Sequence, residues 1–178
     1  MKHSIQKILI TVIACFIFSR SFCQTKVSTL LLAQYNTTMY DRTAGNNPWG
    51  VGLGLQTLLI NKSKFTPTIE LTADLYLEND KVYRMNADGS AINTVPGMIN
   101  LFAGTSFHPV KNLYMSVVGG PSFINGQTLF GIKPSLGFYF SRSHRCTGKI
   151  SYINIFKRDK TTKEDFGSLS FAVGIKLF

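Results

Sequence analysis

The 178-residue chain lacks several features that define common protein classes. Charged residues make up only 16% of it, below the roughly one quarter that is typical of soluble domains. Cys146 is the single cysteine after residue 23, which excludes a disulfide framework. No long apolar run and no convincing helical period follow the N-terminus, so a bundle of transmembrane helices is excluded. The apolar residues, 44% of the chain, must be dispersed along other elements.

The N-terminus has the three parts of a secretory signal peptide. Its basic residues are Lys2, His3 and Lys7. An apolar run over residues 8–18 is too short to span a bilayer as a helix. Ser21 and Cys23 then place small side chains at the two positions that a signal peptidase reads. We therefore expect an exported protein with a signal peptide over residues 1–23 and one domain over residues 24–178.

Period-two alternation of apolar and polar side chains recurs along that domain. Its clearest segments are residues 69–77, 130–140 and 169–177. In the first of these, Leu71, Ala73 and Leu75 alternate with Thr72 and Asp74. Weaker segments are residues 27–35, 49–60, 95–107, 113–121 and 146–156, and the facing of 95–107 and 146–156 stays open. The count is about eight strands of about ten residues, the length that a tilted membrane strand needs.

The connections between these segments alternate in length. The short ones are residues 61–64, 109–112 and 141–145, the longer ones are 40–48, 78–94 and 157–165, and 122–128 is intermediate. Outer-membrane barrels have short periplasmic turns and longer external loops, whereas a β-sandwich has no reason to alternate in this way. We therefore predict an all-β fold, an antiparallel up-and-down transmembrane β-barrel of about eight strands.

Charged residues fall on the polar face of the predicted strands. They are Glu70, Asp74, Lys133 and Lys176. The interior of an eight-stranded barrel is narrow and filled by side chains, and buried charges require partners. We therefore predict an ionic cluster of these four residues in the lumen. If the strands formed a soluble sheet instead, the same residues would be solvated surface charges.

Aromatic residues collect near the ends of the predicted strands. Those near the longer connections are Tyr35, Trp49, Tyr76, Phe130 and Phe156, and those near the short turns are Phe65, Phe107, Phe138, Phe140 and Phe178. Two aromatic belts of this kind are expected at the two membrane interfaces.

The end of the chain, Ser168-Leu169-Ser170-Phe171-Ala172-Val173-Gly174-Ile175-Lys176-Leu177-Phe178, alternates and closes on an aromatic residue. Together with the export signal and the size, it resembles the outer-membrane β-barrel domain proteins of Gram-negative bacteria. The resemblance covers residues 24–178 and implies a location in the outer membrane and recognition by the barrel-assembly machinery. One departure from the family pattern concerns Phe178. It falls on the same face of the last predicted strand as Lys176 and not on the apolar face. Family members include anchors, adhesins, defence proteins and some lipid-modifying enzymes, so the resemblance implies no single activity.

Basic residues are densest in the predicted external connection at residues 157–165. They include Lys157, Arg158 and Lys160, interrupted by Asp159. The plainer interpretation is a solvated loop tip. The functional hypothesis is contact with the phosphates of lipopolysaccharide in the outer leaflet, and the net charge of +10 is not taken to indicate nucleic acid.

Catalytic and metal-binding patterns are scarce. His108 and His144 lie in or beside short turns, and neither has an evident carboxylate partner. They form no metal spacing with Cys146 either. We therefore expect a protein that is not an enzyme and that binds no cofactor or metal. We expect a barrel that anchors surface loops and uses residues 78–94 as its contact surface. The alternatives are a secreted, soluble, lipocalin-like barrel that binds an apolar ligand and a lipid-modifying barrel enzyme.

Overall fold

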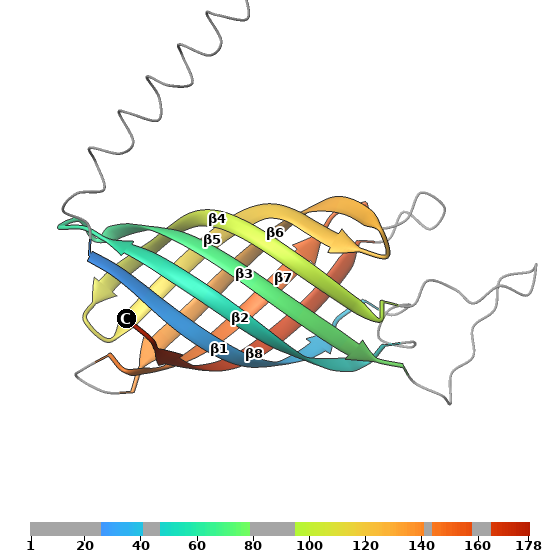
Figure 1. Ribbon diagram of the computed structural model, residues 1–178, viewed down its shortest axis with the longest axis horizontal. Helices are drawn as coiled ribbons and strands as arrows, with labels where there is room; N and C mark the ends of the chain where they lie inside the picture. The colour runs from blue at the N-terminus through green and yellow to red at the C-terminus, as the bar shows by residue number, and fades with distance from the viewer. Residues whose placement is uncertain (1–25, 41–46, 79–94, 141–143, 158–164) are drawn as a thin grey trace, which may run out of the picture.

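Eight antiparallel strands form a closed barrel in the computed structural model of the chain (Figure 1). The structure describes residues 26–40, 47–78, 95–140, 144–157 and 165–178. The strands are β1 (Lys26–Thr38), β2 (Trp49–Ile60), β3 (Phe65–Leu77), β4 (Gly97–Val110), β5 (Leu113–Ile124), β6 (Gln127–Tyr139), β7 (Cys146–Ile155) and β8 (Phe166–Lys176). Each strand pairs with the next, and β8 pairs with β1. The predicted up-and-down barrel is confirmed.

No helix in these described ranges is long and apolar enough to cross a membrane. The predicted signal peptide, residues 1–23, lies outside them. The two ends of the barrel differ in the length of their connections. The short-turn end carries the connections at residues 61–64, 111–112 and 140–145, and the long-loop end carries those at 39–48, 78–96, 125–126 and 156–165. The C-terminus lies at the short-turn end (Figure 1).

The pairing register explains why the strands tilt. Thr66 on β3 lies opposite Ser106 on β4. A path through directly opposed residues continues around the barrel and returns to β3 at Tyr76. The path is offset by ten residues, from 66 to 76, over eight strands. Closure with such an offset requires strands that slant across the barrel axis, as Figure 1 shows.

The prolines within strands occupy positions where one neighbouring ladder is absent. Pro67 precedes the part of β3 that pairs with β2, which begins at Thr68. Pro134 falls in an interruption of the pairing between β6 and β7. Because proline has no N–H to donate, these are the positions at which a closed sheet tolerates it.

The connection between β5 and β6 differs from the intermediate loop predicted over residues 122–128. The strands continue to Ile124 and from Gln127, so Asn125 and Gly126 alone form the turn. Their φ angles are 48° and 75°. A two-residue hairpin turn requires positive φ at both residues if its twist is to match that of the flanking strands. The Asn-Gly pair favours this turn because both residues adopt positive φ at low cost.

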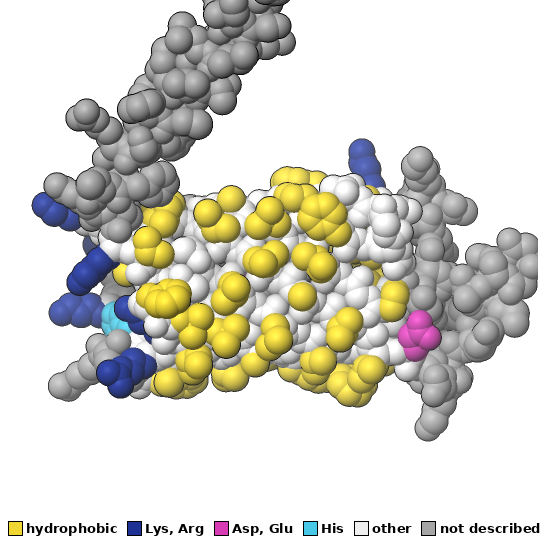
Figure 2. All heavy atoms as spheres, viewed as in Figure 1, with side chains coloured by type: hydrophobic (Ala, Val, Ile, Leu, Met, Phe, Trp, Pro, Cys, Tyr) yellow, Lys and Arg dark blue, Asp and Glu magenta, His cyan; other side chains and the backbone are white. Residues whose placement is uncertain are grey.

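The barrel wall is apolar outside and polar inside. Along β3, every odd-numbered residue is exposed and every even-numbered one is buried, with Leu75 64% exposed and Glu70 fully buried. Hydrophobic side chains cover the middle of the wall in Figure 2. The predicted facing of residues 69–77, 130–140 and 169–177 is confirmed. A soluble barrel has the opposite distribution, because its core must be apolar.

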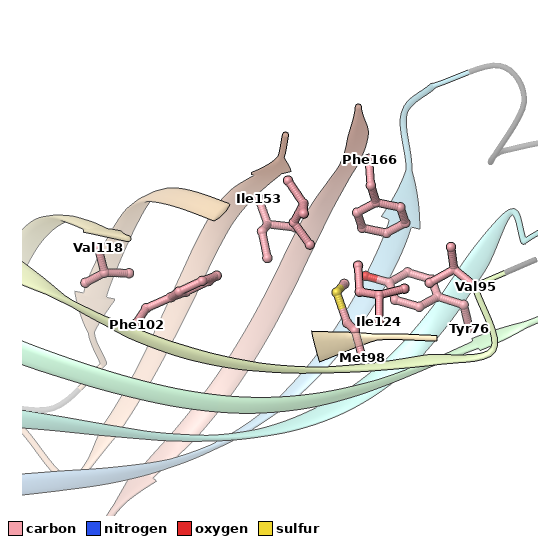
Figure 3. Close-up of a cluster of buried hydrophobic side chains, with 9 residues drawn as sticks. Tyr76, Val95, Met98, Phe102, Val118, Ile124, Ile153 and Phe166 are labelled. Atoms are coloured by element: carbon pink, nitrogen blue, oxygen red, sulfur yellow. The ribbon is translucent and has the colours of Figure 1, made fainter. Parts of the chain in front are cut away.

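Two clusters of buried hydrophobic side chains help to fill the lumen. The first, drawn in Figure 3, extends toward the long-loop end and comprises Tyr76, Val95, Met98, Phe102, Val118, Ile124, Ile153, Ile155 and Phe166. The second lies toward the short-turn end and comprises Leu30, Leu32, Leu58, Tyr114, Tyr139 and Ala172. Tyr76 was expected in an outer aromatic belt. Its even parity on β3 turns it inward instead, edge-to-face with Phe166 at 5.3 Å.

Candidate functional site

A buried ion-pair cluster crosses the lumen. Glu70 on β3 receives one ammonium group on each carboxylate oxygen. Lys133 Nζ on β6 lies 2.7 Å from Oε1, and Lys149 Nζ on β7 lies 2.7 Å from Oε2. All three side chains have almost no exposed surface. Because β3 lies across the narrow barrel from the paired strands β6 and β7, the cluster joins opposite walls of the lumen by charge-assisted hydrogen bonds.

Lys149 extends this cluster to a fourth strand. Its Nζ also donates to Oε1 of Gln56 on β2, at 3.2 Å. The side chains of Phe102 and Tyr114, both fully buried, fill other parts of the lumen. The described lumen thus contains polar and aromatic side chains packed into the space that an open channel would need.

Asp74 forms a second polar cluster, nearer the long-loop end. Its Oδ1 accepts hydrogen bonds from Asn36 Nδ2 at 2.8 Å and from Gln34 Nε2. Its Oδ2 accepts from Thr72 Oγ1 at 3.3 Å and from Asn100 Nδ2 at 3.2 Å. These donors are neutral, so hydrogen bonds and not an ion pair satisfy this carboxylate. The fully or nearly fully buried charges of the described residues still balance, with two lysines and two carboxylates.

The structure brings together only part of the predicted ionic cluster. Glu70 and Lys133 are in contact. Asp74 forms no ion pair with any described base, and Lys176 forms none with any described acid. Lys176 has the inward parity that the sequence indicates, but it is the last residue of β8 and is exposed at the short-turn end. Whether a residue number is odd or even predicts the face of the strand on which its side chain lies. It does not predict how far along the barrel axis the side chain lies.

Sequence reasoning missed Lys149 and Gln56. A signal for Lys149 exists, because the polar residues Thr147, Lys149 and Ser151 alternate and all three are buried. Ile153 and Ile155, on the same inward face, obscure the pattern because both belong to the hydrophobic cluster in the lumen.

The predicted lipid-contact residues are only partly described. Lys157 is exposed at the long-loop end, with a φ of 56°, and its backbone N–H donates to Asp165 Oδ1 at 2.9 Å. Arg158 and Lys160 lie outside the described residues, as does the predicted contact surface over residues 78–94 except for Glu78.

The two histidines stack on tyrosines at the short-turn end. His144 lies parallel to Tyr139, with ring centroids 4.4 Å apart, and His108 stacks on Tyr114 at 5.8 Å. Within the described segments, neither imidazole forms an ion pair with a carboxylate. No group of three or more His, Cys, Asp or Glu side chains there could hold a metal ion.

Exposed or half-buried aromatic side chains flank the apolar wall at both ends. Toward the long-loop end, Tyr35 stacks near Trp49 and Phe130 near Phe156. Toward the short-turn end, Phe65 packs on Phe107 at 4.9 Å and Phe138 on Phe140 at 4.8 Å. These pairs lie where an apolar band meets polar surroundings, as at the two interfaces of a bilayer.

The closed wall, its apolar exterior and its charged lumen define a transmembrane β-barrel of the outer-membrane class. Every strand has paired neighbours, so the wall exposes no open sheet edge to lipid. The exposed leucines would be unfavourable in water and suit the hydrocarbon of the outer membrane, where the protein resides. The lipocalin-like alternative is wrong, because it requires an apolar interior and a polar exterior.

Known structures share this architecture at low sequence identity. The outer membrane protein Ail of Yersinia pestis, determined in phospholipid bilayer nanodiscs, has a TM-score of 0.53 and 11% identity over 85% of this chain and 100% of Ail. Neisserial surface protein A has a TM-score of 0.51 and 10% identity over 85% of this chain and 97% of its own. A de novo designed transmembrane β-barrel has a TM-score of 0.53 and 7% identity over 84% of this chain and 95% of its own. No protein-family model and no curated protein matches the sequence.

Proposed function

We propose that the protein is a non-enzymatic outer-membrane barrel that holds external loops on a closed, non-conducting wall. The observation that carries this proposal is the filled lumen, in which Glu70 binds Lys133 and Lys149 across the barrel. An eight-stranded barrel is just wide enough for side chains to fill. A plug of this kind favours an anchoring role over transport.

The loops would provide the binding function. Three of the four connections at the long-loop end are longer than those at the short-turn end, which corresponds to the external side of outer-membrane barrels. Residues 78–94 belong to the longest connection and are the proposed contact surface, with an extracellular partner of unspecified chemistry. The described histidines stack on tyrosines and form no ion pairs, which supports a role without catalysis.

The proposed partners follow from the membrane setting. The assembly machinery would recognise β8 together with the terminal Phe178 that follows it. Lys157, Arg158 and Lys160 would contact lipopolysaccharide phosphates, since ammonium and guanidinium groups bind phosphate by charge-assisted hydrogen bonds. We propose no nucleic-acid partner and no cofactor.

The lumen proposal is tested by conductance in a planar bilayer. The protein should first be recovered from the outer-membrane fraction and migrate differently unboiled and boiled on a denaturing gel. Reconstituted wild-type protein should then give no steady conductance. A combined Glu70→Ala, Lys133→Ala and Lys149→Ala variant that still migrates as a folded barrel should give measurable current. Steady conductance of the wild-type protein would contradict a closed lumen.

The external contact is tested by the amount of lipopolysaccharide that co-purifies from the outer-membrane fraction. Charge reversal of Lys157, Arg158 and Lys160 to Glu should lower that amount. Lys26→Glu, at the opposite end of the barrel, is the control and should leave it unchanged. Equal co-purification from the triple variant and wild-type protein would refute the assignment.

A further inference from the structure

Positive charge is concentrated at the short-turn end of the barrel. Among the described residues, the cationic side chains there are Lys26, Lys62, Lys64, Lys111, Arg145 and Lys176. Dark blue side chains of Lys and Arg gather at that end in Figure 2. The four described acidic side chains lie elsewhere. Glu70 and Asp74 are buried in the lumen, and Glu78 and Asp165 lie at the long-loop end. No described ion pair therefore neutralises this end.

Four of these cations surround a concave mouth. A cavity of about 470 Å³ opens there, and its lining includes Lys62, Lys64, Lys111 and Lys176. His108 and His144 line the same cavity, together with Tyr139. Like charges around a concavity with low-dielectric walls raise the local concentration of anions, because the walls focus the field. The mouth thus combines a positive potential with hydrogen-bond donors that converge from several turns.

Backbone hydrogen bonds and ring contacts connect the walls of this mouth. The backbone N–H of His108 donates to Lys64 O at 2.9 Å, which ties β4 to the turn before β3. The backbone N–H of Tyr139 donates to Asn112 O at 2.8 Å. The His144 ring lies on the Tyr139 ring at 4.4 Å with an interplanar angle of 6°. These contacts hold the two imidazoles and the lysine-bearing turns in place before any ligand arrives.

The chemistry of the mouth favours phosphate over other anions. A phosphate group accepts several charge-assisted hydrogen bonds on its oxygens, and lysine binds it well as a point charge. Exposed Phe65 and Phe140 lie at the same end and mark the level of the membrane interface, where phospholipid phosphates are found. A soluble phosphorylated molecule could reach the mouth along the barrel axis.

We propose that the mouth at the short-turn end is a binding site for a phosphate-bearing anion. Lys62, Lys64, Lys111 and Lys176 supply the charge, and His108 and His144 contribute ring nitrogens to its wall. The phosphate comes either from a phospholipid headgroup of the adjoining leaflet or from a soluble phosphorylated molecule. The site lies at the opposite end from the external loops and is independent of their proposed function.

The test uses the protein with ¹⁵N-labelled histidine in nanodiscs at constant pH. In one arm, nanodiscs of neutral phosphatidylcholine are titrated with inorganic pyrophosphate. In the other, phosphatidylcholine is replaced stepwise by phosphatidylglycerol. We expect a saturable change in the imidazole NMR signals of His108 and His144 in at least one arm. A change only with phosphatidylglycerol assigns a lipid source, and a change with pyrophosphate assigns a soluble ligand. No saturable change in either arm overturns the proposal.

Matched variants test the assignment to the lysines. Combined Lys62→Gln, Lys64→Gln and Lys111→Gln should weaken the apparent affinity by about tenfold or more, since hydrogen bonds to charged groups are lost. The corresponding Lys→Arg variant keeps the charge and should keep the binding. Lys26→Gln, at the same end of the barrel but outside the lining of the cavity, is the control and should bind as wild-type.

Heat-dependent gel mobility verifies that each variant is folded. If the triple variant does not fold, Lys176→Gln on the other side of the mouth is used and should weaken binding in the same direction. Binding that is unaffected by the folded Gln variants would overturn the site.

Discussion

Lys149 Nζ lies 2.7 Å from Glu70 Oε2, although the two residues are 79 positions apart in sequence and lie on β7 and β3. With Lys133 on the other carboxylate oxygen, this contact makes Glu70 the centre of the polar lumen. A fully buried carboxylate that holds two ammonium groups cannot lose its charge without leaving both cations unpaired. The stability of the barrel should therefore depend strongly on this one residue.

Replacement of Glu70 by Gln should destabilise the protein by about 3–5 kcal/mol, because it leaves uncompensated charge in the interior. The measurement is urea unfolding of protein refolded in phosphatidylcholine vesicles. Glu78→Gln, which changes an exposed carboxylate at the end of β3, is the control and should alter stability by about 0.5 kcal/mol or less. Similar losses from both replacements would contradict the central role of Glu70.

Asp74→Asn should lower stability by about 1–3 kcal/mol, because it places an amide N–H₂ against side chains that donate to the carboxylate. A double-mutant cycle with Asn100→Ala provides the measurement. Since Asn100 donates to Asp74 Oδ2, the two changes should be non-additive. Strict additivity would show that the hydrogen bond contributes nothing to stability.

The exterior of the barrel should be sensitive to charge in proportion to depth in the bilayer. Leu71→Arg, in the middle of β3, should cost about 2–4 kcal/mol, whereas Leu77→Arg, at the end of the strand, should cost about 0–1 kcal/mol. Both are measured by unfolding from vesicles. Equal and negligible effects would indicate that the wall faces water.

Gly126→Ala should destabilise the hairpin of β5 and β6 by about 1–2 kcal/mol, because a side chain at a φ of 75° is strained. Gly126→Asn is the matched variant and should lose less, since asparagine adopts this conformation more readily. Thermal unfolding of the two variants distinguishes them. A Cβ at this position would meet no atom within 4 Å, so an equal loss from both variants would contradict backbone strain as the cause.

Much of the architecture could be predicted from local patterns. The alternation of Leu71, Thr72, Ala73 and Asp74 identifies a strand with two unlike faces, because successive side chains of a strand point to opposite sides. The tight turn between β5 and β6 was predictable too. Asn125-Gly126 is a strong hairpin signal, which the prediction of a longer loop overlooked.

Strands with apolar residues on both faces were harder to interpret. On β4, Met98 and Phe102 face the lumen while Ile99 and Leu101 face outward. Because the lumen contains hydrophobic clusters as well as polar ones, alternation between apolar and polar residues disappears there. Which face of such a strand points into the lumen is decided by its pairing with the neighbouring strands.

The sequence by itself determined the eight strands, their antiparallel order and the polarity of the wall, because turn signals and period-two alternation are local properties of the chain. Only the tertiary structure decided which charges meet. Glu70 reaches Lys149 and not Lys176 because the ten-residue offset around the barrel sets the depth of every inward residue. That offset arises from pairing among all eight strands, and the closing pair, β1 with β8, joins segments from opposite ends of the domain.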